Sequence, residues 1–122
     1  VQVGQELVFL NSDPIFHNVH SFPKKSVPFN LALPNRGKKT SKRFASPEVM
    51  VEVRCDIHGW MRAYAGVLPH PYFAVSDRSG AFAIQGLPAG TYTVEAWHEV
   101  LGTKTQSVTL GASDKKALTF DF

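Results

Sequence analysis

Two short segments of the chain contain side chains that bind soft metal ions. The segment from Cys55 to Met61 has the spacing C-x-x-H-x-x-M, and the upstream HNVH segment adds His17 and His20. A thiolate with imidazoles and a weak thioether suits an electron-transfer copper ion, whereas magnesium and calcium prefer oxygen ligands. One loop that delivers cysteine, histidine and methionine can surround a single point, and a histidine from another strand can close the site. The residue types therefore predict a site for one copper ion.

The residues before Cys55 predict a β-strand that directs the thiol inward. Side chains alternate between the two faces of a strand, so the three valines of residues 49–54 share one face and Cys55 continues their parity. Upstream, residues 5–10 form an apolar run that stops at a turn signal in residues 11–14, and His17 follows this turn. His20 lies three residues beyond His17 and hence on the opposite face, so we expect it not to be a ligand.

The rest of the chain also predicts β-structure. Apolar residues do not recur with helical spacing, whereas short β-rich runs alternate with glycine and proline, as in a sandwich or barrel. Turns are expected at residues 77–80 and 86–90. The expected later strands are residues 63–68, 72–76, 81–84, 91–98, 105–110 and 116–122.

Composition limits the classes of protein to which the chain can belong. Its 122 residues are 43% hydrophobic and 19% charged, which is sufficient for one domain or two very small ones. No apolar run approaches the roughly 20 residues that a membrane helix needs. A single cysteine excludes an internal disulfide. The chain opens at Val1 without an initiator methionine or a signal-like segment, so we expect a processed, trimmed or incomplete chain.

The HNVH and C-x-x-H-x-x-M motifs resemble those of the cupredoxins, the blue copper proteins, and look most like amicyanin and plastocyanin-like relatives. The resemblance covers roughly residues 1–68, although Gly59 stands where such loops often carry proline. It implies a Greek-key β-sandwich that holds one type 1 copper ion, and it implies that Asn18 ties the two ligand loops together by hydrogen bonds. The implied copper ligands are His17, Cys55, His58 and Met61.

Residues 79–94 resemble the carboxypeptidase regulatory-like and transthyretin-like β-sandwich modules, in which G-x-F-x-I and L-P-A-G-x-Y-x-V form consecutive strands. We therefore expect a cupredoxin-like domain over residues 1–68 and a small immunoglobulin-like or transthyretin-like module over residues 69–122. The combination resembles bacterial exported methylamine-utilisation or plastocyanin-like proteins, which implies a periplasmic or exported location. In those relatives further β-sequence precedes the position of Val1. The first domain is thus expected to lack N-terminal strands, and its open edge to be covered by the second half, an N-terminal segment or a neighbouring chain.

Residues 23–43 concentrate positive charge and contain no aspartate or glutamate. This segment favours electrostatic attraction to an acidic redox partner, such as a c-type cytochrome or a membrane redox complex, and a solvated loop is the alternative. Trp60, inside the ligand loop, is expected either to form an apolar docking rim or to shield the metal. Nucleic-acid binding is not expected, because the segment lacks an array of aromatic stacking platforms. Its cations are Lys24, Lys25, Arg36, Lys38, Lys39, Lys42 and Arg43.

Three functional classes remain open from the sequence. The first is a type 1 copper electron carrier or the electron-transfer subunit of a larger assembly. The second is a copper-binding or delivery protein, and the third is a structural subunit of a redox complex with an empty or degenerate site. An enzyme is not expected, because a Cys55–His58 nucleophilic pair would leave Met61 unexplained and no paired carboxylates or zinc motif accompany it.

Overall fold

The computed structural model describes residues 1–122, and every regular element in it is a β-strand, so the all-β prediction is confirmed. The chain divides into two compact units, Val1–Phe73 and Ala74–Phe122. The predicted domain boundary between residues 68 and 69 stays a prediction. The chain contains no helix with the length and apolar character required to cross a membrane.

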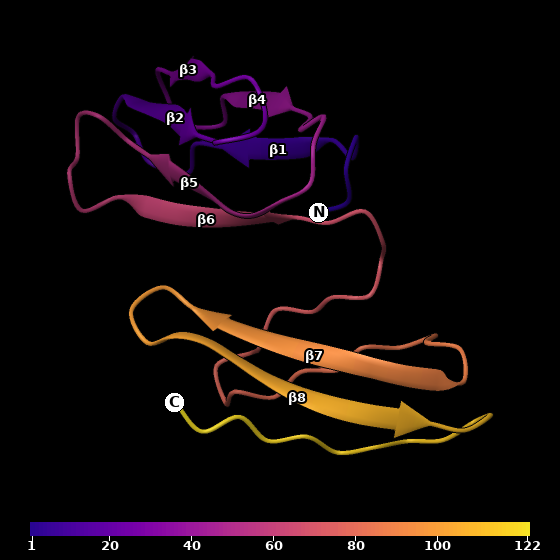
Figure 1. Ribbon diagram of the computed structural model, residues 1–122. Helices are drawn as coiled ribbons and strands as arrows, with labels where there is room; N and C mark the ends of the chain where they lie inside the picture. Colours follow the sequence, from indigo (N-terminus) through magenta and orange to yellow (C-terminus); the bar gives the residue numbers. More distant parts are fainter. The chain divides into compact units, whose positions relative to one another are not determined.

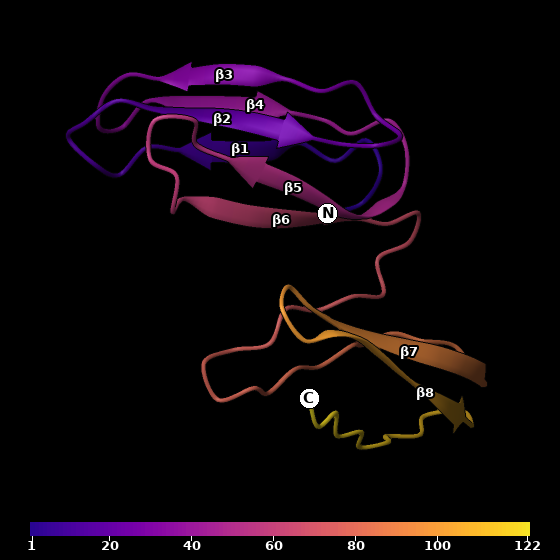
Figure 2. The ribbon, with the colours of Figure 1, turned by 60° about the vertical axis from the view of Figure 1, so that its left-hand side comes forward.

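The first unit contains six antiparallel strands in two sheets. The larger sheet has the order β3-β2-β5-β6, and the smaller pairs β1 with β4 (Figures 1 and 2). In this order β2 pairs with β5, which ends just before Cys55. The strands are β1 (Leu7–Leu10), β2 (His17–Phe22), β3 (Asn30–Leu33), β4 (Lys39–Lys42), β5 (Glu48–Arg54) and β6 (Arg62–Val67).

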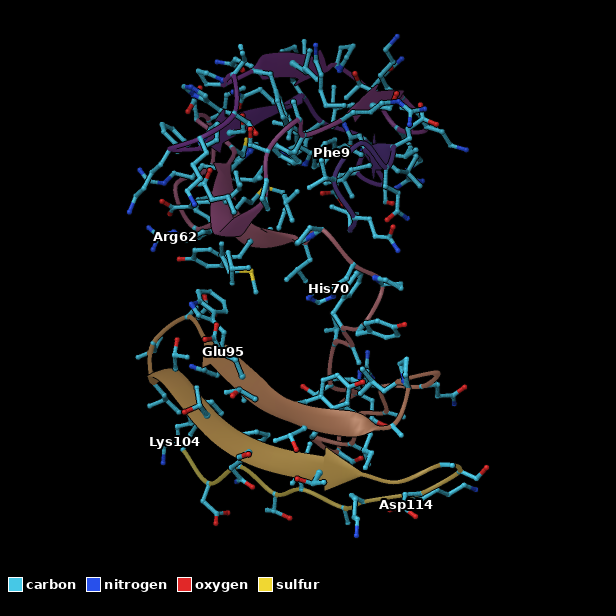
Figure 3. All side chains as sticks on the ribbon, turned by 45° about the vertical axis from the view of Figure 1, so that its right-hand side comes forward. Phe9, Arg62, His70, Glu95, Lys104 and Asp114 are labelled. Carbon is cyan, nitrogen blue, oxygen red and sulfur yellow. The ribbon has the colours of Figure 1, made fainter.

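Two apolar clusters form the core of the first unit. The first contains Phe44, Val51 and Val67, which expose at most 1% of their surface. The second contains Val19, Leu33 and Val53, and Phe9, labelled in Figure 3, packs against it. Phe29 packs against both clusters and joins them into one interior. Val19 of this interior belongs to β2, which begins at His17, and Val53 belongs to β5, which ends just before Cys55.

The predicted inward face of β5 is correct for its second half and wrong at its start. Val51, Val53 and Cys55 are buried, as the alternation predicted, but Val49 is 46% exposed. The pairing of β5 with β6 shifts register between Glu48 and Val51, and such an irregularity reverses the side-chain parity of the residues before it. Glu48 is buried instead of Val49.

The first strand of the smaller sheet has an open edge. β1 pairs with β4 on one side and with no other strand of the described chain. Val8 and Leu10 of β1 are both more than half exposed. That a further segment or a neighbouring chain covers this edge stays a prediction.

The second unit is built around one hairpin, in which β7 (Gly90–His98) pairs antiparallel with β8 (Gly102–Leu110). The flanking chain segments run alongside it in both ribbon views (Figures 1 and 2). The strands predicted at residues 91–98 and 105–110 are confirmed. Those predicted at residues 72–76, 81–84 and 116–122 are wrong, because these segments form no backbone ladder. Their alternation instead reflects side-chain packing, as in the contact of Phe82 with Phe120, whose ring centroids are 6.3 Å apart.

Candidate metal centre

Three predicted ligands converge at one end of the larger sheet. His17 Nδ1 lies 3.1 Å from His58 Nδ1, and Cys55 Sγ lies 3.8 Å from His17 Nδ1 and 3.6 Å from His58 Nδ1. These three residues form a cluster whose ligand atoms all lie within 4.8 Å of one another. His17 and Cys55 are each only 6% exposed, whereas His58 is half-buried. The thiol of Cys55 and the imidazole of His17 therefore face a common point from inside the unit. The imidazole of the half-buried His58 faces the same point from the surface.

The pairing of β2 with β5 brings these ligands together. His17 is the first residue of β2, and Cys55 directly follows Arg54, the last residue of β5, which pairs with His20. The loop after Cys55 is closed by two backbone hydrogen bonds. Met61 N–H donates to the carbonyl of His58 at 2.9 Å, and Cys55 N–H donates to the carbonyl of Met61 at 3.1 Å. This tight loop returns His58 to the side of Cys55.

The three separations fit a single bound metal ion. With metal–nitrogen bonds of about 2.0 Å and metal–sulfur bonds of about 2.3 Å, one ion can join two nitrogens up to about 4.0 Å apart and a sulfur and a nitrogen up to about 4.3 Å apart. All three separations in the structure lie inside these limits. Two imidazoles and one thiolate in such a trigonal set, with a long axial thioether, are the ligands that distinguish a blue copper site from other metal sites.

Met61 and His17 line a common pocket, which is formed mainly by residues of β1 and β2 and also includes Asp13. Met61 is half-buried. Its predicted role as the axial ligand stays a prediction.

The hydrogen-bond partners of the Cys55 thiol are two backbone N–H groups and two imidazoles. Burial raises the pKa of the thiol. Hydrogen bonds lower the pKa by a larger amount, to about 6, and they involve the backbone N–H groups of Asn18 and His58 and the imidazoles of His58 and His17. The site therefore favours the thiolate, which is the form that binds metals.

In the metal-free protein, Cys55 is expected to ionise near pH 6. An unfolded cysteine has a pKa of about 8.5. Between the folded pKa and this unfolded pKa, the thiol therefore binds fewer protons in the folded chain than in the unfolded chain. The free energy of unfolding should therefore rise with pH across this window and fall as the solution is acidified through it. Thiolate ultraviolet absorbance and the rate of alkylation measure the ionisation, and Cys55→Ser provides the blank. A midpoint at or above the unfolded value would contradict this prediction.

Asn18 links the two ligand segments, which is the place that the cupredoxin resemblance implied for it. Its side-chain oxygen accepts a hydrogen bond from the Asp56 backbone N–H at 2.7 Å, and its amide nitrogen donates to the Asp56 carboxylate at 2.8 Å. Asn30 donates to the same carboxylate at 3.2 Å, and His20 Nδ1 lies 3.0 Å from it. His20 therefore contacts Asp56 on the opposite face of β2 and does not join the ligand cluster.

Asn18→Ala is expected to weaken copper binding by about 10- to 100-fold, as is typical when a residue that orients a metal ligand is lost. The variant removes both side-chain contacts to Asp56 and frees the residue after Cys55 to move. Competition with a copper chelator measures the affinity. Asn35→Ala is the matched control, because Asn35 is exposed and only its backbone carbonyl is hydrogen-bonded. Equal affinities of the two variants would contradict the linking role.

Two residues beside the cluster were not predicted from the sequence. Asp13 Oδ2 lies 2.9 Å from His17 Nε2, and this hydrogen bond, followed by that with Cys55, raises the pKa of His17. Asp56 occupies the centre of the network described above, and its pKa is lowered mainly by hydrogen bonds from His20 and Asn18. The sequence features that could have indicated these two residues are a carboxylate four residues before His17 and another directly after Cys55.

Two exposed apolar side chains lie beside His58 in the chain, and the basic residues lie on other elements of the first unit. Trp60 is 81% and Ile57 56% exposed, and the rings of His58 and Trp60 have centroids 5.3 Å apart. The predicted docking cations are all exposed. They occupy β4 and the loops between β2 and β5: Lys24, Lys25, Lys38, Lys39, Lys42 and Arg43.

Comparison with known proteins supports the prediction for the second half of the chain. Residues 66–122 match the family model of the carboxypeptidase regulatory-like domain, as the resemblance of the second half predicted. A solved structure titled "Novel Purple Cupredoxin from Nitrosopumilus maritimus" is similar at 24% sequence identity and a TM-score of 0.47, over 55% of this chain and 73% of that chain. No curated protein matched the chain. The cupredoxin-like character of the first unit rests on its own sheets and on its clustered histidine and cysteine ligands.

Proposed function

We propose that the first unit binds one type 1 copper ion and functions as an electron carrier. The observation that carries this proposal is the convergence of Cys55 Sγ with the Nδ1 atoms of His17 and His58, at separations of 3.1 to 3.8 Å. These three residues would hold the ion, with Met61 as the axial ligand. When bound, the copper supplies a reversible one-electron couple, whose potential depends on the axial ligand and on the hydrogen bonds around the sulfur.

The residues of the site suit repeated electron transfer. His17 and Cys55 are buried and fixed to paired strands, and Asn18 ties their segments together. A rigid ligand set needs little rearrangement between two oxidation states. His58 is half-buried beside the exposed Trp60, so the apolar surface around this ring provides the nearest approach for a redox partner.

The proposed partner is an acidic redox protein, such as a c-type cytochrome or a membrane redox complex, in the periplasm or at the outer surface of a bacterium. The exposed cations of residues 23–43 support this choice, since clustered charge raises the rate of association with an oppositely charged surface. Increasing ionic strength should therefore slow electron transfer to an acidic cytochrome. A rate independent of salt would argue against this class of partner.

Voltammetry of the copper-loaded protein tests the electron-carrier function. The expected result is a reversible one-electron wave together with rapid reduction by a small electron donor. Tight copper binding without a reversible wave would exclude electron transfer and favour copper delivery. Failure to bind copper would favour the structural subunit.

A further inference from the structure

A carboxylate outside the ligand set contacts the buried histidine. Asp13 Oδ2 lies 2.9 Å from His17 Nε2, on the side of the ring away from the cluster. An ionised carboxylate only accepts hydrogen bonds, so His17 Nε2 must carry the proton. In a neutral imidazole the lone pair is then on Nδ1, which is the atom that faces Cys55 and His58. The contact thus selects the tautomer that can bind a metal.

The backbone of Asp13 is held in place by Asn11, which is only 2% exposed. The Asn11 side-chain oxygen accepts from Asp13 N–H at 2.8 Å, and its amide nitrogen donates to the carbonyls of Ile15 at 2.8 Å and Leu33 at 2.9 Å. Leu33 is the last residue of β3 and pairs with His17 across the sheet. One buried side chain therefore ties the turn before β2 to β3, the strand that pairs with His17.

We propose that Asp13 is a positioning residue for the copper site, which holds His17 with Nδ1 directed at the cluster and places a fixed negative charge behind that imidazole. This inference rests on the proposed function. A carboxylate bonded to the remote nitrogen increases the donor strength of a ligating histidine. The added negative charge stabilises the more highly charged oxidised copper ion over the reduced ion. Asp13 therefore lowers the reduction potential of the site.

Two substitutions separate the charge of Asp13 from its hydrogen bond. Asp13→Asn keeps an oxygen that can accept from His17 Nε2, and Asp13→Ala removes both properties. Each is expected to weaken copper(II) binding relative to copper(I) by about tenfold, which for a one-electron couple raises the potential by about 59 mV. Glu6→Gln is the matched control, because it also removes one exposed carboxylate, which contacts Ser41 and Arg43 but no copper ligand. Potentials equal to that of Glu6→Gln would overturn the electrostatic role.

Nuclear magnetic resonance of the metal-free protein provides a readout that does not depend on copper. Proton–nitrogen spectra of the imidazole should show the Nε2–H tautomer of His17 in the wild type and in Asp13→Asn, and a mixture of tautomers in Asp13→Ala. A wild-type ring with its proton on Nδ1 would overturn the positioning role. If the wild type bound no copper but showed the Nε2–H tautomer, the proposed function would fail while the contact of Asp13 with His17 stood.

Discussion

Replacing Cys55 with serine is expected to abolish the intense visible absorption of the copper-loaded protein. The absorption would arise from charge transfer between the Cys55 thiolate and copper, and a serine hydroxyl is neither ionised at neutral pH nor a soft ligand. Copper(I) affinity should also fall by more than about 100-fold, beyond the usual effect of losing only a supporting residue. Absorption spectra and chelator competition measure the two effects.

The matched control for this substitution is His70→Ala. His70 is exposed, lies outside the cluster and contacts Tyr72. The control should keep both the absorption and the affinity of the wild type. A Cys55→Ser protein that retained the visible band would show that the chromophore does not involve this thiolate, and it would remove Cys55 from the site.

Phe44→Ala is expected to lower the free energy of unfolding of the first unit by about 3 to 5 kcal/mol, the usual range for removing a fully buried phenylalanine. Phe44 is 1% exposed, and Phe29 packs against its cluster, with the ring centroids of Phe29 and Phe44 5.7 Å apart. Small movements of the neighbouring valines are not expected to fill the cavity that the loss of the benzyl group leaves. The loss is a large fraction of the stability of a small unit.

Hydrogen exchange at the amides of Val51 and Val67 measures this effect within the first unit alone. Phe22→Ala is the control, because Phe22 is 40% exposed and lies outside both apolar clusters. It should cost no more than about 1.5 kcal/mol, in keeping with a side chain that leaves little cavity. An equal loss of unfolding free energy in the two variants would show that the buried Phe44 contributes no more to the stability of this unit than the exposed Phe22.

Alternation along the strands predicted much of what positions the site. The parity of Val51, Val53 and Cys55 placed the thiol inside, and the structure shows all three buried. Alternation failed at Val49, because a register irregularity depends on how two strands pair and leaves no mark in one strand's sequence. It also failed at residues 116–122, where Leu118 and Phe120 alternate in an extended segment that has no ladder partner.

The ligand cluster was predictable because one loop supplies two of its members at fixed spacing. Cys55 and His58 are three residues apart, and the resemblance to the cupredoxins supplied His17 from the HNVH segment. Asp13 was not predictable in the same way. Its contact with His17 depends on a turn fixed by Asn11, whose partners include the carbonyl of Leu33, far along the chain. Spacing alone does not reveal such long-range hydrogen bonds.

Titration of the purified, fully reduced protein with copper, followed by visible absorption and electron paramagnetic resonance, tests the central claim most directly. The account predicts an intense thiolate-to-copper band that saturates at one copper ion per chain, with the spectrum of a type 1 site. A colourless complex, or weak binding that is the same in the wild type and in Cys55→Ser, would contradict it.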